Sequence, residues 1–118
     1  MIRILTAALV LALFHSGAVA QDIGGRYRVS GTNLDGSKYT GTATVTLQSD
    51  VTCTIRWNTG GDGADGVCMR DKGVFVAGYV MGDSVGLVVY DILPDGTLTG
   101  RWTVTGQSGI GTEVLSPN

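Results

Sequence analysis

Two cysteines are the first candidates for chemistry in this chain. Cys53 and Cys68 lie the same number of residues on either side of the Gly60-Gly61 pair, so a hairpin that turned there would place the two sulfur atoms opposite each other. In an oxidising compartment such a pair forms a disulfide. A redox-active pair is normally Cys-x-x-Cys at the start of a helix, and a zinc site needs two further ligands that the neighbouring sequence lacks. The spacing therefore predicts a structural disulfide.

Acidic side chains are the next candidates, either as calcium ligands or as catalytic acids. Segment 58–66 is rich in oxygen atoms, but its acidic residues do not alternate and no glutamate closes it, so it lacks the EF-hand pattern. Glu113 is the only glutamate and could be a buried acid, but the sequence places no second carboxylate with it for glycoside hydrolysis. Four aspartates each precede a glycine, as is typical of turns: Asp35, Asp62, Asp65 and Asp95. We predict no metal site, no cofactor and no catalytic residue.

Aromatic side chains are the remaining candidates, and they point to binding instead of catalysis. We single out Trp57, Trp102, Tyr79 and Tyr90 as candidate ligand-binding residues. In a small β protein most such side chains belong to the core. In a barrel, some of them could line a pocket at one mouth, where an aromatic floor holds an apolar or sugar ligand. Both interpretations remain open from the sequence.

The first 20 residues are typical of a secretory signal peptide. Arg3 precedes an apolar run over residues 4–14, and Ala18-Val19-Ala20 supplies the small residues that a signal peptidase needs. The run is too short to cross a hydrocarbon layer about 30 Å thick. We therefore expect a signal peptide over residues 1–20 and a single domain over residues 21–118. We also expect a periplasmic or secreted location, with no membrane attachment after cleavage.

Composition narrows the function classes further. Cleavage before Gln21 would leave 98 of the 118 residues, enough for one small core. Arg3 and His15 would be removed with the signal peptide. The mature chain would then contain seven basic and ten acidic side chains, which gives it a net charge of −3. Such a chain has no basic stripe for nucleic acid and no imidazole for general-base catalysis. We therefore expect no nucleic-acid partner and no enzymatic activity.

A period of two in hydrophobicity predicts that strands position all of these residues. In segment 39–48 the inward set would be Tyr39, Gly41, Ala43, Val45 and Leu47, with threonines on the other face. Glycine-containing turns separate the alternating segments. The sequence predicts about eight strands, centred on segments 26–30, 39–48, 51–57, 66–69, 74–81, 85–90, 98–104 and 112–115.

Short connections between these strands require antiparallel pairing. We predict an all-β fold, a small antiparallel up-and-down β-barrel of about eight strands with one disulfide, because closure removes exposed edges. A two-sheet β-sandwich is the alternative. Segments 74–81 and 85–90 are apolar on both faces, so they should form the most buried hairpin or carry an exposed patch.

The disulfide also predicts a register. If Cys53 faces Cys68, Arg56 faces Asp65 just below the hairpin tip. The same register turns Val67 and Met69 away from the face that holds Ile55 and Trp57. We therefore predict either a bulge in the return strand or a covered outer face at these two residues.

The motifs of the mature region resemble a group of small exported proteins of Gram-negative bacteria that are commonly labelled fibronectin-binding. Six motifs carry the resemblance: Gly-Arg-Tyr-x-Val-x-Gly-Thr-Asn-x-Asp-Gly-Ser (25–37), Thr-Cys-x-Ile-x-Trp (52–57), Asp-Gly-x-Cys-Met (65–69), Val-Gly-Leu-Val-Val-Tyr (85–90), Pro-Asp-Gly-x-x-x-Gly-x-Trp-Thr (94–103) and Gly-Thr-Glu-Val-Leu (111–115). The resemblance implies a matrix-protein partner and supplies no catalytic residue. Lysozyme-inhibitor barrels of the periplasm are similar in size and class, but their Ser-Gly-x-x-Tyr motif is absent.

Together these observations predict an exported, non-enzymatic binding module with a protein partner outside the cytoplasm. The contact surface would be the hairpin of segments 74–81 and 85–90 or the barrel mouth. One alternative is a small-molecule carrier with an aromatic-lined mouth. Another is an inhibitor of a periplasmic enzyme. The sequence determines neither the ligand nor the oligomeric state.

Overall fold

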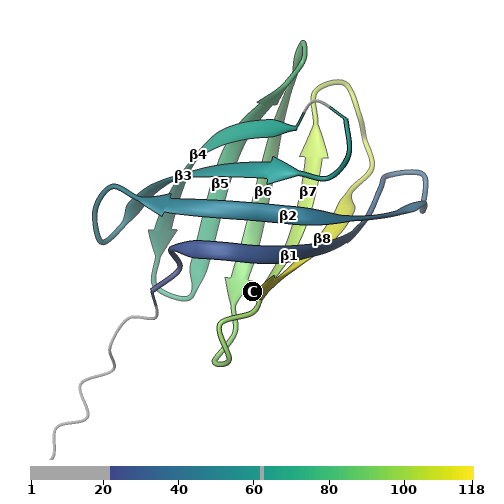
Figure 1. Cartoon of the computed structure of the whole chain (residues 1–118). Coiled ribbons are helices and arrows are strands. Elements are labelled where there is room, and N and C mark those ends of the chain that lie inside the picture. The colour runs from purple at the N-terminus through teal and green to yellow at the C-terminus, as the bar shows by residue number, and fades with distance from the viewer. Residues whose placement is uncertain (1–21, 62) are drawn as a thin grey trace, which may run out of the picture.

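The computed structural model describes residues 22–61 and 63–118, which form a closed antiparallel β-barrel (Figure 1). The expected signal peptide and Asp62 lie outside the described residues. No helix within residues 22–61 and 63–118 is long and apolar enough to cross a membrane. The eight strands are β1 (Gly25–Thr32), β2 (Lys38–Leu47), β3 (Thr52–Asn58), β4 (Ala64–Asp71), β5 (Val74–Met81), β6 (Ser84–Ile92), β7 (Leu98–Val104) and β8 (Gly111–Pro117).

Each strand pairs with the next in the sequence, and β8 closes the sheet by pairing with β1. That last ladder runs from Tyr27 opposite Pro117 to Thr32 opposite Thr112. Closure leaves no strand edge unpaired, which protects a sheet of this size from edge-to-edge association. The predicted up-and-down barrel is confirmed, and the two-sheet sandwich is excluded by the β1–β8 pairing.

Alternation along each strand separates an inner face from an outer one. On β6, for example, Val88 and Tyr90 are buried whereas Val85 and Leu87 are exposed. The inward alternation expected for segment 39–48 is confirmed for Ala43 and Val45, but Leu47 at the strand end is 40% exposed.

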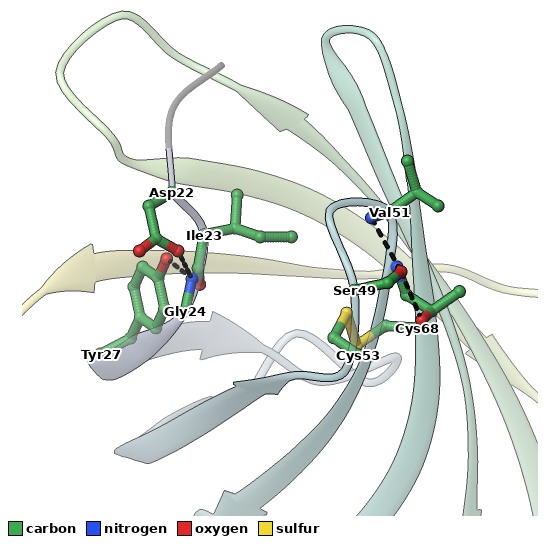
Figure 2. The surroundings of a disulfide bond; sticks show 9 residues. Asp22, Ile23, Gly24, Tyr27, Ser49, Val51, Cys53 and Cys68 are labelled. Atoms are coloured by element: carbon green, nitrogen blue, oxygen red, sulfur yellow. Dashed lines mark hydrogen bonds between the residues drawn. A yellow bond between two sulfur atoms is a disulfide. The ribbon is translucent and has the colours of Figure 1, made fainter. Parts of the chain in front are cut away.

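The barrel has a packed end and a hollow end. Antiparallel order brings the starts of odd-numbered strands and the ends of even-numbered strands to one end of the barrel. The most deeply buried side chains gather there: Phe75, Tyr90, Leu98 and Leu115, all 0% exposed. Ile23 closes this end, and its carbonyl accepts a hydrogen bond of 2.6 Å from the Tyr27 hydroxyl (Figure 2). We refer to this as the closed end and to the opposite one as the open end.

The predicted disulfide joins β3 to β4 near the closed end, beside the turn that contains Ser49 (Figure 2). The Cα atoms of Cys53 and Cys68 are 4.9 Å apart, and both side chains are buried. In the chain-entropy account, closing a loop of this length stabilises the fold by about 3 kcal/mol. The predicted Arg56–Asp65 pair is also present, with Nη1 and Oδ2 2.6 Å apart.

The predicted bulge or covered face at Val67 and Met69 is wrong. Pairing of β3 with β4 is continuous from Thr52–Met69 to Trp57–Ala64, so the register needs no bulge. Val67 is nevertheless 71% exposed and Met69 52% exposed. The disulfide and the inward packing fix the register, and these two side chains join a wider apolar surface on the outside of the barrel.

Candidate functional site

The open end contains a cavity of about 270 Å³. Antiparallel order brings together here the ends of β3, β5 and β7 and the starts of β2, β4 and β8. Four aromatic side chains, each from a different strand, line it: Tyr39 (β2), Trp57 (β3), Tyr79 (β5) and Trp102 (β7). The remaining lining residues are Asn33, Thr59, Gly60, Ala64, Met81, Val88 and Glu113.

A glycine on the neighbouring strand makes room for three of these rings. Gly31 lies opposite Tyr39, Gly86 opposite Tyr79, and Gly111 opposite Trp102. A Cβ atom added to any of these glycines would lie within 2.2 Å of a ring atom of its partner. Each ring therefore packs on bare backbone at the barrel wall, which leaves room for the cavity.

The rings also contact one another in two edge-to-face pairs. The ring centroids of Trp57 and Tyr79 are 5.1 Å apart at an interplanar angle of 61°. Those of Tyr39 and Trp102 are 6.3 Å apart at 71°. Such pairs contribute about 0.5–1.5 kcal/mol beyond the area they bury. They fix the shape of the cavity before any ligand arrives.

Glu113 lies at the floor of the cavity and is 5% exposed. Its Oε1 accepts a hydrogen bond of 3.0 Å from the Tyr39 hydroxyl, and its Oε2 accepts one of 3.1 Å from Trp57 Nε1. The Tyr90 hydroxyl donates a further short hydrogen bond to Oε2 from the closed-end side. Three donors from three strands thus converge on one buried carboxylate.

Burial raises the pKa of the Glu113 carboxyl, and the hydrogen bonds from Tyr90, Tyr39 and Trp57 offset only part of that rise. Burial, together with the negative charge of Glu113, raises the pKa of Tyr79 to about 12. The pKa values of Tyr39 and Tyr90 are raised for the same reasons. The phenols therefore remain protonated donors throughout the physiological pH range.

The four aromatic residues singled out from the sequence divide into two groups. Trp57, Trp102 and Tyr79 line the cavity, whereas Tyr90 lies below it, fully buried, with its ring stacked 5.3 Å from that of Phe75. Tyr90 acts on the cavity indirectly, through its hydrogen bond to Glu113.

Among the lining residues not singled out as ligand-binding candidates, Glu113 and Tyr39 matter most, and the sequence carries a signal for both. Glu113 shares the inward face of β8 with Gly111 and Leu115, and an acid at an inward position is unusual. Tyr39 lies on the inward set expected for segment 39–48. The threefold hydrogen bonding of Glu113 could not be predicted, because Tyr39, Trp57 and Tyr90 come from strands distant in sequence.

The cavity wall carries one carboxylate, and among its described residues it has no arginine or lysine. The described residues contain no group of three or more His, Cys, Asp or Glu side chains that could hold a metal ion. Among the described residues, the wall therefore offers a guest molecule aromatic rings, a single buried acid and few other polar side chains.

A second surface lies on the outside of β4–β7. It is an open depression of about 830 Å³, lined largely by apolar side chains. Its most exposed members are Val67 at 71%, Leu87 at 64% and Ile110 at 62%. This outer apolar face corresponds to the exposed patch that segments 74–81 and 85–90 predicted.

Comparisons with known proteins support the fold. No protein-family model matches the chain, and no curated protein matches it. Among solved structures, the chain is similar to a redesigned β-barrel, mFAP1, bound to DFHBI (TM-score 0.70, 17% identity), covering 80% of this chain and 94% of that one. A second redesigned β-barrel has a TM-score of 0.69 at 17% identity, covering 81% and 91%. A mutant of the fluorescent protein UnaG has a TM-score of 0.53 at 11% identity, covering 80% and 95%.

Proposed function

We propose that this protein binds a small organic molecule in the cavity at the open end of the barrel. The observation that carries the proposal is the division of the barrel interior, which is packed at one end and hollow and aromatic at the other. Similarity of fold to mFAP1, a barrel bound to the small molecule DFHBI, is consistent with this use of the interior.

The binding mechanism follows from the wall. Three rings are held against backbone glycines and cannot collapse into the lumen without leaving those contacts, so the site is formed in advance and little order is gained on binding. The volume of about 270 Å³ lies just below the range typical of sites for drug-sized molecules, so the ligand is small. Binding there requires no opening of the closed end.

Nuclear magnetic resonance offers a direct test, because the sequence contains only two tryptophans and both line the cavity. Their indole N–H groups give two separate signals in the ¹⁵N-labelled protein. We expect 4-methylbenzyl alcohol, 4-methylbenzoate or 4-methylbenzylammonium to shift both signals saturably. Absence of a saturable shift with all three probes would contradict the proposal.

Two variants locate the binding. Ala64 lines the cavity, and Ala64→Phe fills it without removing an existing contact, so it should abolish the shifts. Leu87→Ser changes the outer apolar face and should leave them unchanged. The reverse pattern would place the probes on the outer face and refute binding in the cavity.

A second candidate function is protein binding through the outer apolar face. Monomeric proteins rarely leave a contiguous apolar surface of this kind exposed, and Val67, Leu87 and Ile110 are each more than 60% exposed. The sequence motifs described above suggest fibronectin as the first partner to examine. Immobilised fibronectin should retain the protein saturably but should not retain Leu87→Ser, and equal retention of both would argue against this surface.

A further inference from the structure

We propose that the ligand of the open-end cavity is a small organic cation, an amine carried as its ammonium form on an apolar body. This inference rests on the proposed function and specifies its ligand class. Three features of the cavity lead to it: an acid without a charged partner, an unused acceptor position on that acid, and aromatic rings that border the lumen.

The first feature is an uncompensated acid. Glu113 is 5% exposed, and none of the described residues that line the cavity with it is an arginine or a lysine. Its three hydrogen-bond partners, Tyr39, Trp57 and Tyr90, are all neutral. Burying a carboxylate without a charged partner costs free energy, and a guest that brings a positive charge offsets that cost.

The second feature is the direction of the hydrogen bonds around Glu113. An indole N–H can only donate, so Glu113 Oε2 is an acceptor toward Trp57. The hydroxyls of Tyr39 and Tyr90 donate to the same carboxyl group. A carboxylate has about four acceptor positions, of which three are used, so about one remains for an N–H group of a ligand. An ammonium group that retains at least one N–H suits that position.

The third feature is the orientation of the rings. Tyr39, Tyr79 and Trp102 each pack on a backbone glycine and line the cavity, so the ring of each borders the lumen. The face of an aromatic ring carries negative partial charge and attracts a cation within about 6 Å of its centroid. The aromatic rings and the carboxylate border the same cavity, so a cation bound there would be attracted by both.

The same wall disfavours the other ligand classes. An anion would be repelled by Glu113, and no basic group among the described lining residues would offset that repulsion. A sugar would need several polar partners, and besides Glu113 and the phenol and indole groups the lining offers polar side chains only from Asn33 and Thr59 among the described residues. A neutral apolar molecule could fill the space but would leave the acid unpaired.

The test uses three probes that share one aromatic body and differ in charge. The purified protein is titrated at neutral pH with 4-methylbenzylammonium, 4-methylbenzyl alcohol and 4-methylbenzoate, with the two indole signals as the readout. We expect the ammonium probe to bind about 10-fold or more tightly than the alcohol, and the benzoate more weakly than either. Equal or tighter binding of the alcohol or the benzoate would overturn the cation proposal while leaving the binding function intact. No binding of any probe would refute both.

Variants distinguish the contribution of the Glu113 charge to binding from that of the aromatic rings. Glu113→Gln keeps the shape of the side chain and removes its charge, so it should abolish the preference for the ammonium probe and retain binding of the alcohol. Tyr79→Leu keeps an apolar wall without a ring face and should weaken binding of the ammonium probe selectively. If Glu113→Gln does not fold, Tyr79→Leu still tests the proposal.

Asp91→Asn is the control for surface charge, because it removes an exposed negative charge on the outside of β6. It should change neither the affinity for the ammonium probe nor that for the alcohol. A preference for the ammonium probe that survives in Glu113→Gln but falls in Asp91→Asn would assign it to surface charge and contradict the proposal.

Discussion

At the scale of single residues, the site depends on what lies behind each ring as much as on the ring itself. Four inward tyrosines and tryptophans face a glycine across the sheet, three at the cavity and Tyr90 over Gly100 below it. A side chain at any of these glycines would occupy the place of the ring. The mid-strand glycines therefore set the volume of the cavity as well as allowing the strands to bend.

This leads to a prediction for Gly86→Ala. An added Cβ would lie 2.1 Å from Cζ of Tyr79, so the ring must swing into the lumen. We expect a loss of stability of about 1–3 kcal/mol in urea unfolding, together with at least a several-fold weaker affinity for the probes. Gly78→Ala is the matched control, because the nearest atom to its added Cβ is 3.7 Å away on the outer face. If the two variants lost the same affinity, the role of glycine in shaping the cavity would be disproved.

Glu113 predicts a pH dependence of stability. Burial raises its pKa in the folded protein, so the folded state binds more protons than the unfolded state between the ordinary carboxyl pKa and the raised one. Its contribution to the free energy of unfolding is complete below the unfolded pKa and is lost as pH rises through the folded pKa. Relative to Glu113→Gln, the wild type should therefore be less stable at about pH 7 than at about pH 4. Chemical unfolding at several pH values measures the difference, and parallel curves for the two proteins would contradict it.

How much of the site the sequence could predict also depends on individual residues. The inward direction of Trp57, Tyr79 and Trp102 follows from alternation, which is local information. Whether these rings fill the lumen or lie along its wall depends on glycines of other strands, such as Gly111 behind Trp102. Those contacts are fixed by cross-strand register, and only the β3–β4 register was constrained in advance, by the disulfide.

At the scale of elements, the β3–β4 hairpin shows which contacts determine a register. The positions of Cys53 and Cys68 correctly predicted the pairing down to Arg56 and Asp65. The expected bulge was wrong because it assumed that apolar Val67 must be covered. The inward packing of this hairpin is sufficient to leave that side chain exposed.

The Cys53–Cys68 disulfide and the Arg56–Asp65 salt bridge of this hairpin should differ strongly in their contributions to stability. Replacement of both cysteines by alanine should lower the free energy of unfolding by about 3 kcal/mol, because it frees the loop in the unfolded chain. Arg56→Ala should cost at most about 0.5 kcal/mol, since the side chains of Arg56 and Asp65 are 50% and 73% exposed. Urea unfolding of both variants, with reduced wild type as a reference for the first, measures this. Similar losses for the two would show that the loop constraint is not the main contribution.

At the scale of the whole molecule, the barrel has a tightly packed closed end and an open end that contains the cavity. The closed end holds Phe75, Tyr90, Leu98 and Leu115, each 0% exposed, and Ile23 seals it. The open end leaves a cavity whose wall is fixed by glycine contacts and ring pairs. Tyr90 connects the two, because its ring packs on Phe75 and its hydroxyl reaches Glu113.

This division predicts where hydrogen exchange responds to a ligand. Backbone amides around Phe75 and Leu98 should exchange only through global unfolding, since their side chains have no exposed surface. Amides at the open-end strand termini, near Trp57 and Trp102, should exchange through smaller openings.

A saturating concentration of the ammonium probe should slow amide exchange at the open end directly. It should slow exchange at the closed end only by the increase in global stability, about 2.7 kcal/mol when the probe is present at 100 times its dissociation constant. Mass spectrometry of the exchanged peptides can test this. Protection that appeared first at the closed end would mean that the ligand enters the packed half and that the two halves do not behave as described.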